Sequence, residues 1–445
     1  NVTQLACRTA LTRRGVAHIT MPVDLQSEPY KESDTSKRNV PGHNAALYAR
    51  GARLPDEADL KSAAEVLNAG EKVVIMAGRG AIGAADELEA VAETLGAVIV
   101  KPLLGKSCVP DDSPYTTGPV GLLGSKPSQE ALEQCDTLFI AGSSFPYIEF
   151  YPAPDQARCV QIDLDPQRLG LRYPAEVGLV GDVKRTLEAL QPLLERNEKR
   201  GFLEQAQKGM QEWNELMEQR GTVQDQPMKP QVVAWELGQR LADDAVFTSD
   251  SGTIATWFAR QMRVKRNQLC TLSGNLATMA NGFPYAMAAQ VAWPDRQCVA
   301  FVGDGGFTML MGELATCVKY QLPVKIIIVK NNSLGQIKWE QMVFLGNPEY
   351  GCELQPIDFA AAARAFGAKG YTIEDPADCG RILDEALAEP GPVVVEAVVD
   401  TNEPPMPPKA TLDQSRKLAE SLARGQPNRE KIALTVISDK VRELI

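Results

Sequence analysis

Short apolar segments alternate with helix-forming segments along most of this chain, and this alternation constrains the fold more than any other feature. Helical patterns lie at 85–95, 230–241, 312–319, 359–366 and 381–388. Apolar runs of four to six residues lie at 72–77, 97–100, 137–141, 160–164, 245–249, 298–302, 324–329 and 393–398. Continuous apolar strands separated by helices are typical of parallel sheets that helices cover on both faces. We therefore predict an α/β chain with two doubly wound parallel-sheet domains.

Two polar segments interrupt this alternation and suggest domain boundaries. Residues 26–55 lack an apolar period and are broken by prolines, which predicts a linker. Residues 196–229 are rich in Glu, Lys and Gln, which predicts a solvated helix and a second linker. We therefore predict one domain at 56–195, a second at 230–400 and a C-terminal tail at 401–445.

The first 25 residues are predicted to be the end of a separate domain. Residues 15–24, with the sequence GVAHITMPVD, are expected to form the last buried strand of a domain that ends near residue 25. Too few residues precede this segment to build the rest of such a domain. We therefore expect the chain to be truncated, or to be a fragment of a longer product.

Charge and cysteine content exclude several classes of protein. The net charge of −11 leaves no basic face for displacing counterions, which argues against a general nucleic-acid binder. The nine cysteines form no CxxC pair, so we expect reduced thiols in a cytoplasm. No apolar run reaches the roughly 18 residues that a membrane-spanning helix needs.

The segment 303–335 carries the strongest chemical pattern. Asp304 follows an apolar strand and precedes Gly305 and Gly306, which let backbone N–H groups approach an anion at a helix N-terminus. Asn331 follows the next strand, 331 − 304 = 27 positions later. Neighbouring parallel strands place their C-terminal ends at one edge of a sheet, so these oxygen ligands should meet there and suit Mg²⁺. A plain strand-to-helix turn is the alternative, but the second strand end favours the metal site.

This segment, GDGGFTMLMGELATCVKYQLPVKIIIVKNNSLG, resembles the thiamine diphosphate (ThDP) motif of the pyruvate oxidase/acetolactate synthase family. It is most similar to the bacterial pyruvate:quinone branch. The resemblance covers nearly the whole chain, with 1–25 similar to the end of the pyrimidine-binding domain, 56–195 to the central domain and 230–400 to the diphosphate-binding domain. It implies that Mg²⁺ is held by the side chains of Asp304 and Asn331 and by the carbonyl of Ser333.

The same resemblance assigns roles to further residues near the cofactor. Met279 would support the bent form of ThDP, and Ala277 and Met279 would meet its pyrimidine through their backbones. Positions matching diphosphate contacts are Gly252, Thr253, Gly305, Gly306 and Gly335.

Catalysis would depend on few protein side chains. The chain has only two histidines, whereas ThDP brings its own base for attack on a 2-oxo acid. By resemblance, Ile337 would shape the substrate pocket and Glu340 would relay protons or orient an intermediate. A solvated helix face is the alternative for Glu340. The family's activating Glu would lie upstream of residue 1 and cannot be assigned here.

The central domain would bind FAD in the oxidase relatives. The matching residues follow strand ends, where ligands bind in α/β sheets; they are Gly78, Gly80, Val120, Gly121, Leu122, Leu123, Ser143, Ser144, Phe145, Pro146, Tyr147 and Asp163. Several relatives keep this domain without a flavin. The pair Ile148–Glu149 also replaces a basic residue common in this stretch, which removes one phosphate partner.

The tail predicts an amphipathic helix at 429–445, with Leu434, Ile437, Val441 and Leu444 at helical spacing. In the quinone-reducing relatives such a segment docks on the membrane. Packing against a subunit is the alternative, and the mixed charges of the polar face favour it.

The leading hypothesis is ThDP- and Mg²⁺-dependent oxidative decarboxylation of a 2-oxo acid, pyruvate first, with electrons passing through FAD to a quinone or similar acceptor. One alternative is an acetolactate synthase-like carboligase with structural flavin or none. Another is a truncated, inactive subunit. The resemblance implies a homodimer or homotetramer in the cytoplasm, with peripheral contact to the inner face of the membrane in the oxidase case.

Overall fold

The computed structural model describes residues 2–13, 15–29, 52–405, 407 and 411–442, in two compact units, 1–53 and 54–445. The described part of the first unit holds helices α1 (Val2–Arg13) and α2 (Val23–Gln26). Residues 16–22 form no strand, and Val16 is 98% exposed, so the predicted buried strand at 15–24 is wrong. A buried strand needs a neighbour for its backbone hydrogen bonds, and the described residues of this unit offer none. Most of the predicted 26–55 linker lies outside the described residues.

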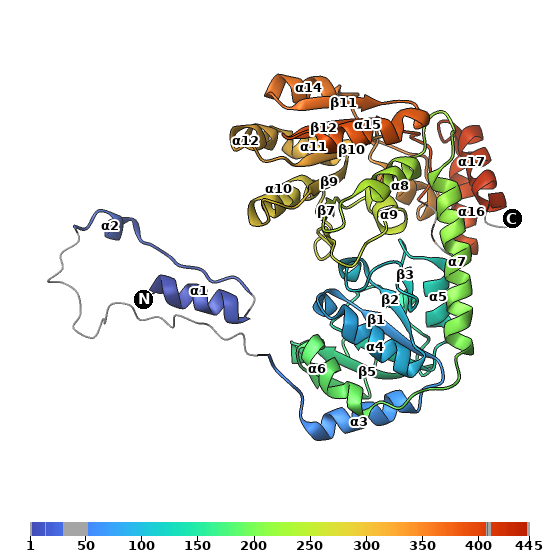
Figure 1. Ribbon diagram of the computed structural model, residues 1–445. Helices are drawn as coiled ribbons and strands as arrows, with labels where there is room; N and C mark the ends of the chain where they lie inside the picture. Colours follow the sequence, from blue (N-terminus) through green and yellow to red (C-terminus); the bar gives the residue numbers. More distant parts are fainter. Residues whose placement is uncertain (1, 14, 30–51, 406, 408–410, 443–445) are drawn as a thin grey trace. The chain divides into compact units, whose positions relative to one another are not determined.

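The second unit begins with a six-stranded parallel sheet (Figure 1). Its spatial order is β3 (Thr116–Pro119), β2 (Val98–Lys101), β1 (Val73–Ala77), β4 (Thr137–Ala141), β5 (Arg158–Asp163) and β6 (Val177–Val180). Alternate residues of β1 enter two different cores, which is why the strand is apolar throughout. One core lies under α3 (Glu57–Asn68), α4 (Ala85–Leu95) and α6 (Val183–Leu190), and the other lies under α5 (Lys126–Gln134).

A second six-stranded parallel sheet follows. Its order is β11 (Lys369–Ile373), β12 (Val393–Val398), β10 (Lys325–Lys330), β9 (Cys298–Gly303), β7 (Val246–Ser249) and β8 (Leu269–Thr271). One face is covered by α8 (Pro230–Arg240), α9 (Thr253–Arg260) and α15 (Pro376–Ala388). The other is covered by α10 (Gly282–Ala292), α11 (Asp304–Leu310), α12 (Leu314–Lys319) and α14 (Phe359–Phe366). The predicted fold class is confirmed, with the eight predicted strands found within two residues.

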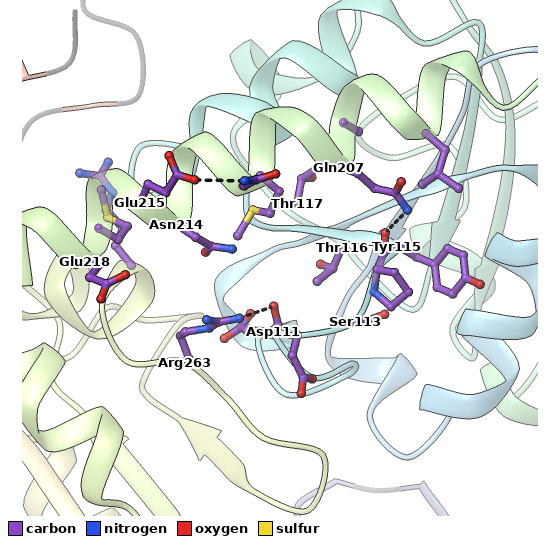
Figure 2. Close-up of a pocket in the computed structure, with 18 of the residues that line it drawn as sticks. Asp111, Ser113, Tyr115, Thr116, Thr117, Gln207, Asn214, Glu215, Glu218 and Arg263 are labelled. Carbon is purple, nitrogen blue, oxygen red and sulfur yellow. Dashed lines mark hydrogen bonds between the residues drawn. The ribbon is translucent and has the colours of Figure 1, made fainter. Parts of the chain in front are cut away.

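Helix α7 (Gly201–Gly221) joins the two sheets; the helix predicted in this segment is confirmed, but it is partly buried and not solvated all round. Its Leu203, Trp213 and Met217 are buried, and the helix packs against α5, α8 and β3. A charged composition hid this apolar stripe, because a helix needs only one buried face. A cavity of about 470 Å³ opens between α7, the loop 111–117 and the region around Arg260 and Arg263 (Figure 2).

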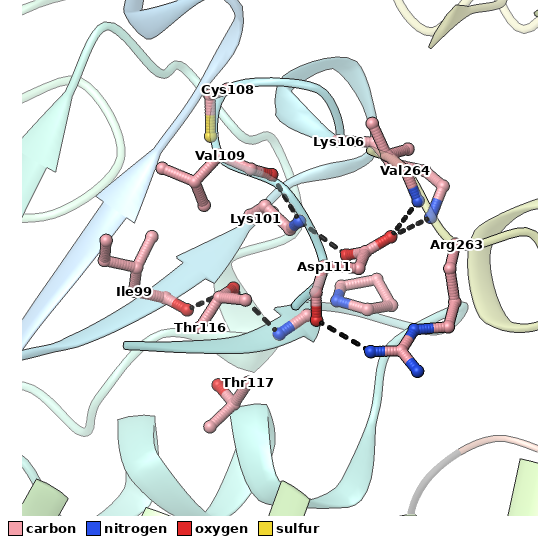
Figure 3. A network of polar contacts seen from close by, with 12 residues as sticks. Ile99, Lys101, Lys106, Cys108, Val109, Asp111, Thr116, Thr117, Arg263 and Val264 are labelled. Carbon is pink, nitrogen blue, oxygen red and sulfur yellow. Dashed lines mark hydrogen bonds and ion pairs between the residues drawn. The ribbon is translucent and has the colours of Figure 1, made fainter. Parts of the chain in front are cut away.

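A buried ionic cluster ties the first sheet to the segment after α9 (Figure 3). Asp111 accepts from Lys101 Nζ at 2.5 Å and Lys106 Nζ at 3.2 Å, and also from the backbone N–H of Val264 at 2.7 Å. Lys106 donates in addition to the carbonyl of Ala259 at 3.1 Å. Burial alone would raise the pKa of Asp111, but the two ammonium groups hold it below its usual range.

The tail forms α16 (Leu412–Ala423), which the sequence analysis missed, and α17 (Arg429–Arg442). Both pack on α13 (Gly335–Val343), where Ile432 is buried against Trp339 and Met342. Leu434 and Ile437 are exposed, so the predicted apolar face is wrong in position; Ile432 and Val436 make the contact instead. The side chain of Val441 and all of Leu444 lie outside the described residues. No helix within the described residues is long and apolar enough to cross a membrane.

The ionic cluster predicts a large stability effect of Asp111→Ala. This change would leave two buried ammonium groups without their carboxylate, which should cost about 3–5 kcal/mol. Urea unfolding followed by circular dichroism should show a markedly lower midpoint. Asp112→Ala is the matched control, because Asp112 is exposed and should change stability by less than about 0.5 kcal/mol. Equal midpoints for the two variants would contradict the role given to Asp111.

Candidate active site

A cavity of about 290 Å³ lies at the C-terminal edge of the second sheet. Three adjacent strands, β7, β9 and β10, end there, and the chain then enters α9, α11 and α13. Three helix N-termini therefore line one cavity, through Thr253, Asp304 and Gly335. The N–H groups and the partial positive charge at helix N-termini favour an anionic ligand such as a diphosphate.

The predicted metal ligands lie together in this cavity. Asp304 is buried; its Oδ1 accepts from Gly305 N at 2.9 Å, and its Oδ2 accepts from Asn332 N at 2.6 Å. The Asn331 side-chain oxygen accepts from Ser333 N at 3.0 Å. Burial raises the pKa of Asp304, although these N–H groups oppose the shift. A bound cation would favour the ionised carboxylate.

Two other segments of the chain hold the loop 331–334 in place. Leu334 N donates to the carbonyl of Cys352 at 2.8 Å, and Leu354 N donates to that of Asn332 at 3.0 Å. Thr401 Oγ1 donates to the carbonyl of Asn331 at 2.8 Å. The loop after β10 is thus fixed by hydrogen bonds from two sides, which preorganises the oxygen ligands.

Two glycines are required by the shape of the cavity. Gly252 has φ +127° and ψ −164°, a conformation that only glycine adopts readily. A Cβ on Gly306 would lie 2.0 Å from Oδ2 of Asp250, so no side chain fits there. A Cβ on Gly335 would lie 3.1 Å from the hydroxyl of Thr253 and 3.2 Å from Nδ2 of Asn331. The diphosphate positions predicted from the sequence are therefore brought together.

The loop carrying Met279 reaches the same place. A Cβ on Gly305 would lie 2.8 Å from Cε of Met279, which locates this side chain above the glycines. Ala277 and Ala280 have φ values of +50° and +70°, which non-glycine residues rarely adopt. Such strain persists only where the surroundings enforce it, and it is common in ligand sites.

The charges of the cavity suit a divalent cation. None of the residues lining it is a Lys, Arg or His, whereas Asp250, Asp304, Asp400 and Glu403 all line it. From outside the lining, Lys229 pairs with Asp400 and Glu403 at 3.2 and 2.8 Å, and Lys431 pairs with Asp400 at 3.1 Å. A diphosphate here would need a cation between itself and Asp304. Carboxylate, amide and carbonyl oxygens, such as those of Asp304, Asn331 and Ser333 in this lining, are of the kind that Mg²⁺ prefers.

Sequence reasoning missed Asp250, Asp400 and Glu403. Asp250 directly follows β7, and Asp400 and Glu403 follow β12, which neighbours β10. The strand-end rule that identified Asp304 would have found them. Asp250 is fully buried, and its Oδ2 has no hydrogen-bond partner within the described structure.

Of the two residues predicted to act on the substrate, Ile337 and Glu340, only the first lines the cavity. Ile337 lines the cavity and is 47% exposed. Glu340 does not line it; its carboxylate accepts from Gln336 Nε2 at 2.9 Å, and Gln336 does line the cavity. Glu340 therefore meets the cavity only through Gln336.

Comparison with known proteins identifies the family. Residues 250–397 match the C-terminal TPP binding domain of thiamine pyrophosphate enzymes, and residues 60–190 match their central domain. The chain is 37% identical over 439 residues to YdaP of Bacillus subtilis, named as a candidate thiamine pyrophosphate-containing protein. That match covers 99% of this chain and 75% of YdaP. This chain belongs to the thiamine pyrophosphate (thiamine diphosphate) enzyme family.

Two further thiamine pyrophosphate enzymes indicate the branches involved. A probable acetolactate synthase large subunit of Methanocaldococcus jannaschii is 32% identical, covering 90% of this chain and 69% of its own length. A pyruvate oxidase of Lactiplantibacillus plantarum is 28% identical, covering 93% and 68%. The chain is thus related to both the acetolactate synthase and pyruvate oxidase branches of the family.

The residues predicted for FAD lie at the C-terminal edge of the first sheet. The Gly78–Gly80 turn packs on the Gly142–Ser143 turn, where a Cβ on Gly78 would lie 2.5 Å from the carbonyl oxygen of Gly142. A Cβ on Gly121 would lie 2.8 Å from the ring of Phe145. Ser144 accepts from Arg168 at 2.8 Å. Burial raises the pKa of Asp163 at the end of β5.

The buried Asp250 predicts a pH-dependent stability. Burial raises its pKa from 3.8 to about 6, although the N–H groups of Gly282 and Ala280 lower it. The folded state therefore holds a proton that the unfolded chain releases at lower pH, so stability should fall as pH rises from about 4 to 6. Asp250→Asn removes this loss, which amounts to about 3 kcal/mol at most.

Thermal unfolding at two pH values would test this. Asp250→Asn should raise the Tm relative to the parent at pH 7.5 and have little effect at pH 4. Asp244→Asn, at an exposed position, should give the same difference at both pH values. A gain for Asp250→Asn that is equal at the two pH values would refute the proposed titration.

Proposed function

We propose that this protein decarboxylates a 2-oxo acid, pyruvate first, with ThDP held by Mg²⁺ in the cavity of the second sheet. The observation that carries this proposal is the meeting of Asp304 and Asn331 with three helix N-termini in a cavity lined by no cationic side chain. Bound ThDP would supply a carbanion that attacks the 2-oxo carbonyl. The protein supplies the metal ligands, the anion site and the shielding.

The chain's residues would divide the binding work. Asp304, the Asn331 side-chain oxygen and the Ser333 carbonyl would hold Mg²⁺ on one side of the diphosphate. The N–H groups around Gly252, Thr253, Gly305, Gly306 and Gly335 would hold the phosphate oxygens. This division is supported by the lack of a cationic lining side chain, since the metal would then carry the positive charge.

The apolar residues would orient the bound ring and limit water. Met279 packs over Gly305, so the cofactor would rest on a side chain that adapts to an irregular surface. Ile337 would border the substrate space. Glu340 would act on that space through Gln336, as a positioning residue.

Asp304→Ala should abolish Mg²⁺-dependent binding of ThDP. The change removes the one carboxylate among the metal ligands, so affinity should fall by at least about a hundredfold. Isothermal titration calorimetry with ThDP in the presence of Mg²⁺ would measure this. Asp295→Ala, at an exposed position before β9, is the control and should bind as the parent does. Undiminished affinity in Asp304→Ala with an intact fold would sink the metal assignment.

We further propose that the residues at the edge of the first sheet would hold FAD, which would supply the oxidant for the decarboxylation product and a route to a quinone or similar acceptor. Support comes from the similarity to a pyruvate oxidase and from the position of these residues just beyond the strand ends of the first sheet. The similarity to an acetolactate synthase supports a second candidate, in which a second 2-oxo acid takes the place of the oxidant.

Anaerobic addition of pyruvate to protein loaded with ThDP, Mg²⁺ and FAD would separate these candidates. Oxidation through the flavin predicts bleaching of its absorbance near 450 nm together with release of CO₂. Acetolactate formation without bleaching would reject the oxidase and favour carboligation. The Asp304→Ala variant should give neither result.

A subunit contact near the site is also part of this proposal. Leu276 is 85% exposed, and Tyr285, Met309 and Tyr320 are exposed on nearby elements of the second sheet. Large exposed apolar side chains of this kind mark interaction surfaces. They support a homodimer or homotetramer.

A further inference from the structure

The carboxylate of Asp250 lines the cavity of the second sheet but is not among the proposed metal or phosphate contacts. Asp250 directly follows β7 and is 1% exposed. A carboxylate is costly to bury, so its contacts should account for its position. Those contacts join it to the Met279 loop, residues 272–281, which lies between β8 and α10.

Hydrogen bonds from the end of β7 fix the C-terminal end of the Met279 loop. Oδ1 of Asp250 accepts from Gly282 N at 2.6 Å. Thr248 Oγ1 donates to the carbonyl of Gly282 at 2.6 Å, and Asn281 Nδ2 donates to the carbonyl of Ser249 at 3.0 Å. Three consecutive residues at the strand end therefore hold the point where the loop enters α10.

The backbone of the Met279 loop is strained. Ala277 and Ala280 have φ values of +50° and +70°. For a residue with a side chain, this region is about tenfold less populated than the ordinary helical one. The carboxylate of Asp250 accepts a hydrogen bond from the N–H of Ala280 itself. Such strain persists only where the surroundings enforce it, so loss of this carboxylate should let the loop leave its conformation.

The conformation of the loop determines where Met279 lies. A Cβ on Gly305 would lie 2.8 Å from Cε of Met279, and a Cβ on Gly306 would lie 2.0 Å from Oδ2 of Asp250. Asp250 therefore contacts the loop through one carboxylate oxygen and the glycine turn after β9 through the other. It sets the distance between Met279 and that turn.

We propose that Asp250 is a positioning residue that holds Met279 where the apolar part of the cofactor binds. This inference rests on the proposed function, because it assigns Met279 to the ring end of ThDP. The loop 331–334 is held by other residues, namely Cys352, Leu354 and Thr401. The two ends of the cavity are thus fixed by separate contacts, and Asp250 acts on one of them.

Two ligands, each with Mg²⁺, distinguish these ends by isothermal titration calorimetry: ThDP and inorganic diphosphate. Diphosphate has no ring, so it reports on the metal and anion site alone. The ratio of the two affinities cancels any effect at that common end, including the loss of a negative charge. Asp250→Ala should lower the affinity for ThDP relative to diphosphate by about tenfold or more, because the loop then occupies the binding conformation only part of the time.

Asp250→Asn is the matched control. It also removes the charge, but its amide oxygen can still accept from Gly282 N. The ratio of affinities should therefore stay within about twofold of the parent value. An unchanged ratio in Asp250→Ala, or an equal fall in Asp250→Asn, would overturn the positioning role. Absence of ThDP binding in the parent would instead overturn the proposed function, and this inference with it.

Two further variants keep the test independent of the folding of Asp250→Ala. Thr248→Val removes another hydrogen bond to the same end of the loop and should lower the ratio by about threefold or more. Met279→Ala should lower the ratio as well, and adding Asp250→Ala to it should lower the ratio little further, since the two residues act through one contact. Effects that multiply in the double variant, or no effect of Thr248→Val, would contradict the proposal.

Discussion

Parallel pairing of β9 and β10 is the constraint on which the candidate active site depends. Their register sets Gly303 opposite Val329, so the chain leaves both strands at the same height. Asp304 and the Asn331–Ser333 loop then meet without any long side chain having to reach across. The helices that follow bring their N-termini to the same edge because each is entered directly from a strand end. The oxygen ligands and the anion site are thus products of one backbone arrangement.

The buried central strands of both sheets could be predicted from the sequence. The buried strands were found because alternate residues enter two cores and both must be apolar, as in β1 and β10. Strands β3, β6, β8 and β11 were missed because each carries a polar residue or a glycine; their sequences are TTGP, VGLV, LCT and KGYTI. The segment 15–24 failed because an apolar run does not specify a partner strand.

For the candidate sites, too, the sequence predicted the residues that strand ends position and missed those that depend on contacts between distant segments. Asp304 and Asn331 could be predicted because strand ends position them, whereas the buried state of Asp250 depends on Gly282 and Gly306 from distant segments. The cavity beside α7 could not be predicted, since its walls come from residues about 150 positions apart.

Helix α9 has a mechanical consequence. Its eight residues carry Thr253 of the anion site at one end and Arg260, bound to three carbonyls of the first sheet's domain, at the other. At 1.5 Å per residue the two ends are only about 12 Å apart. Because α9 is a short helix fixed at both ends, a rotation of one domain relative to the other would also move Thr253 in the anion site. The orientation of the two sheets and the position of the anion site are therefore coupled through α9, so a change in one is expected to require a change in the other.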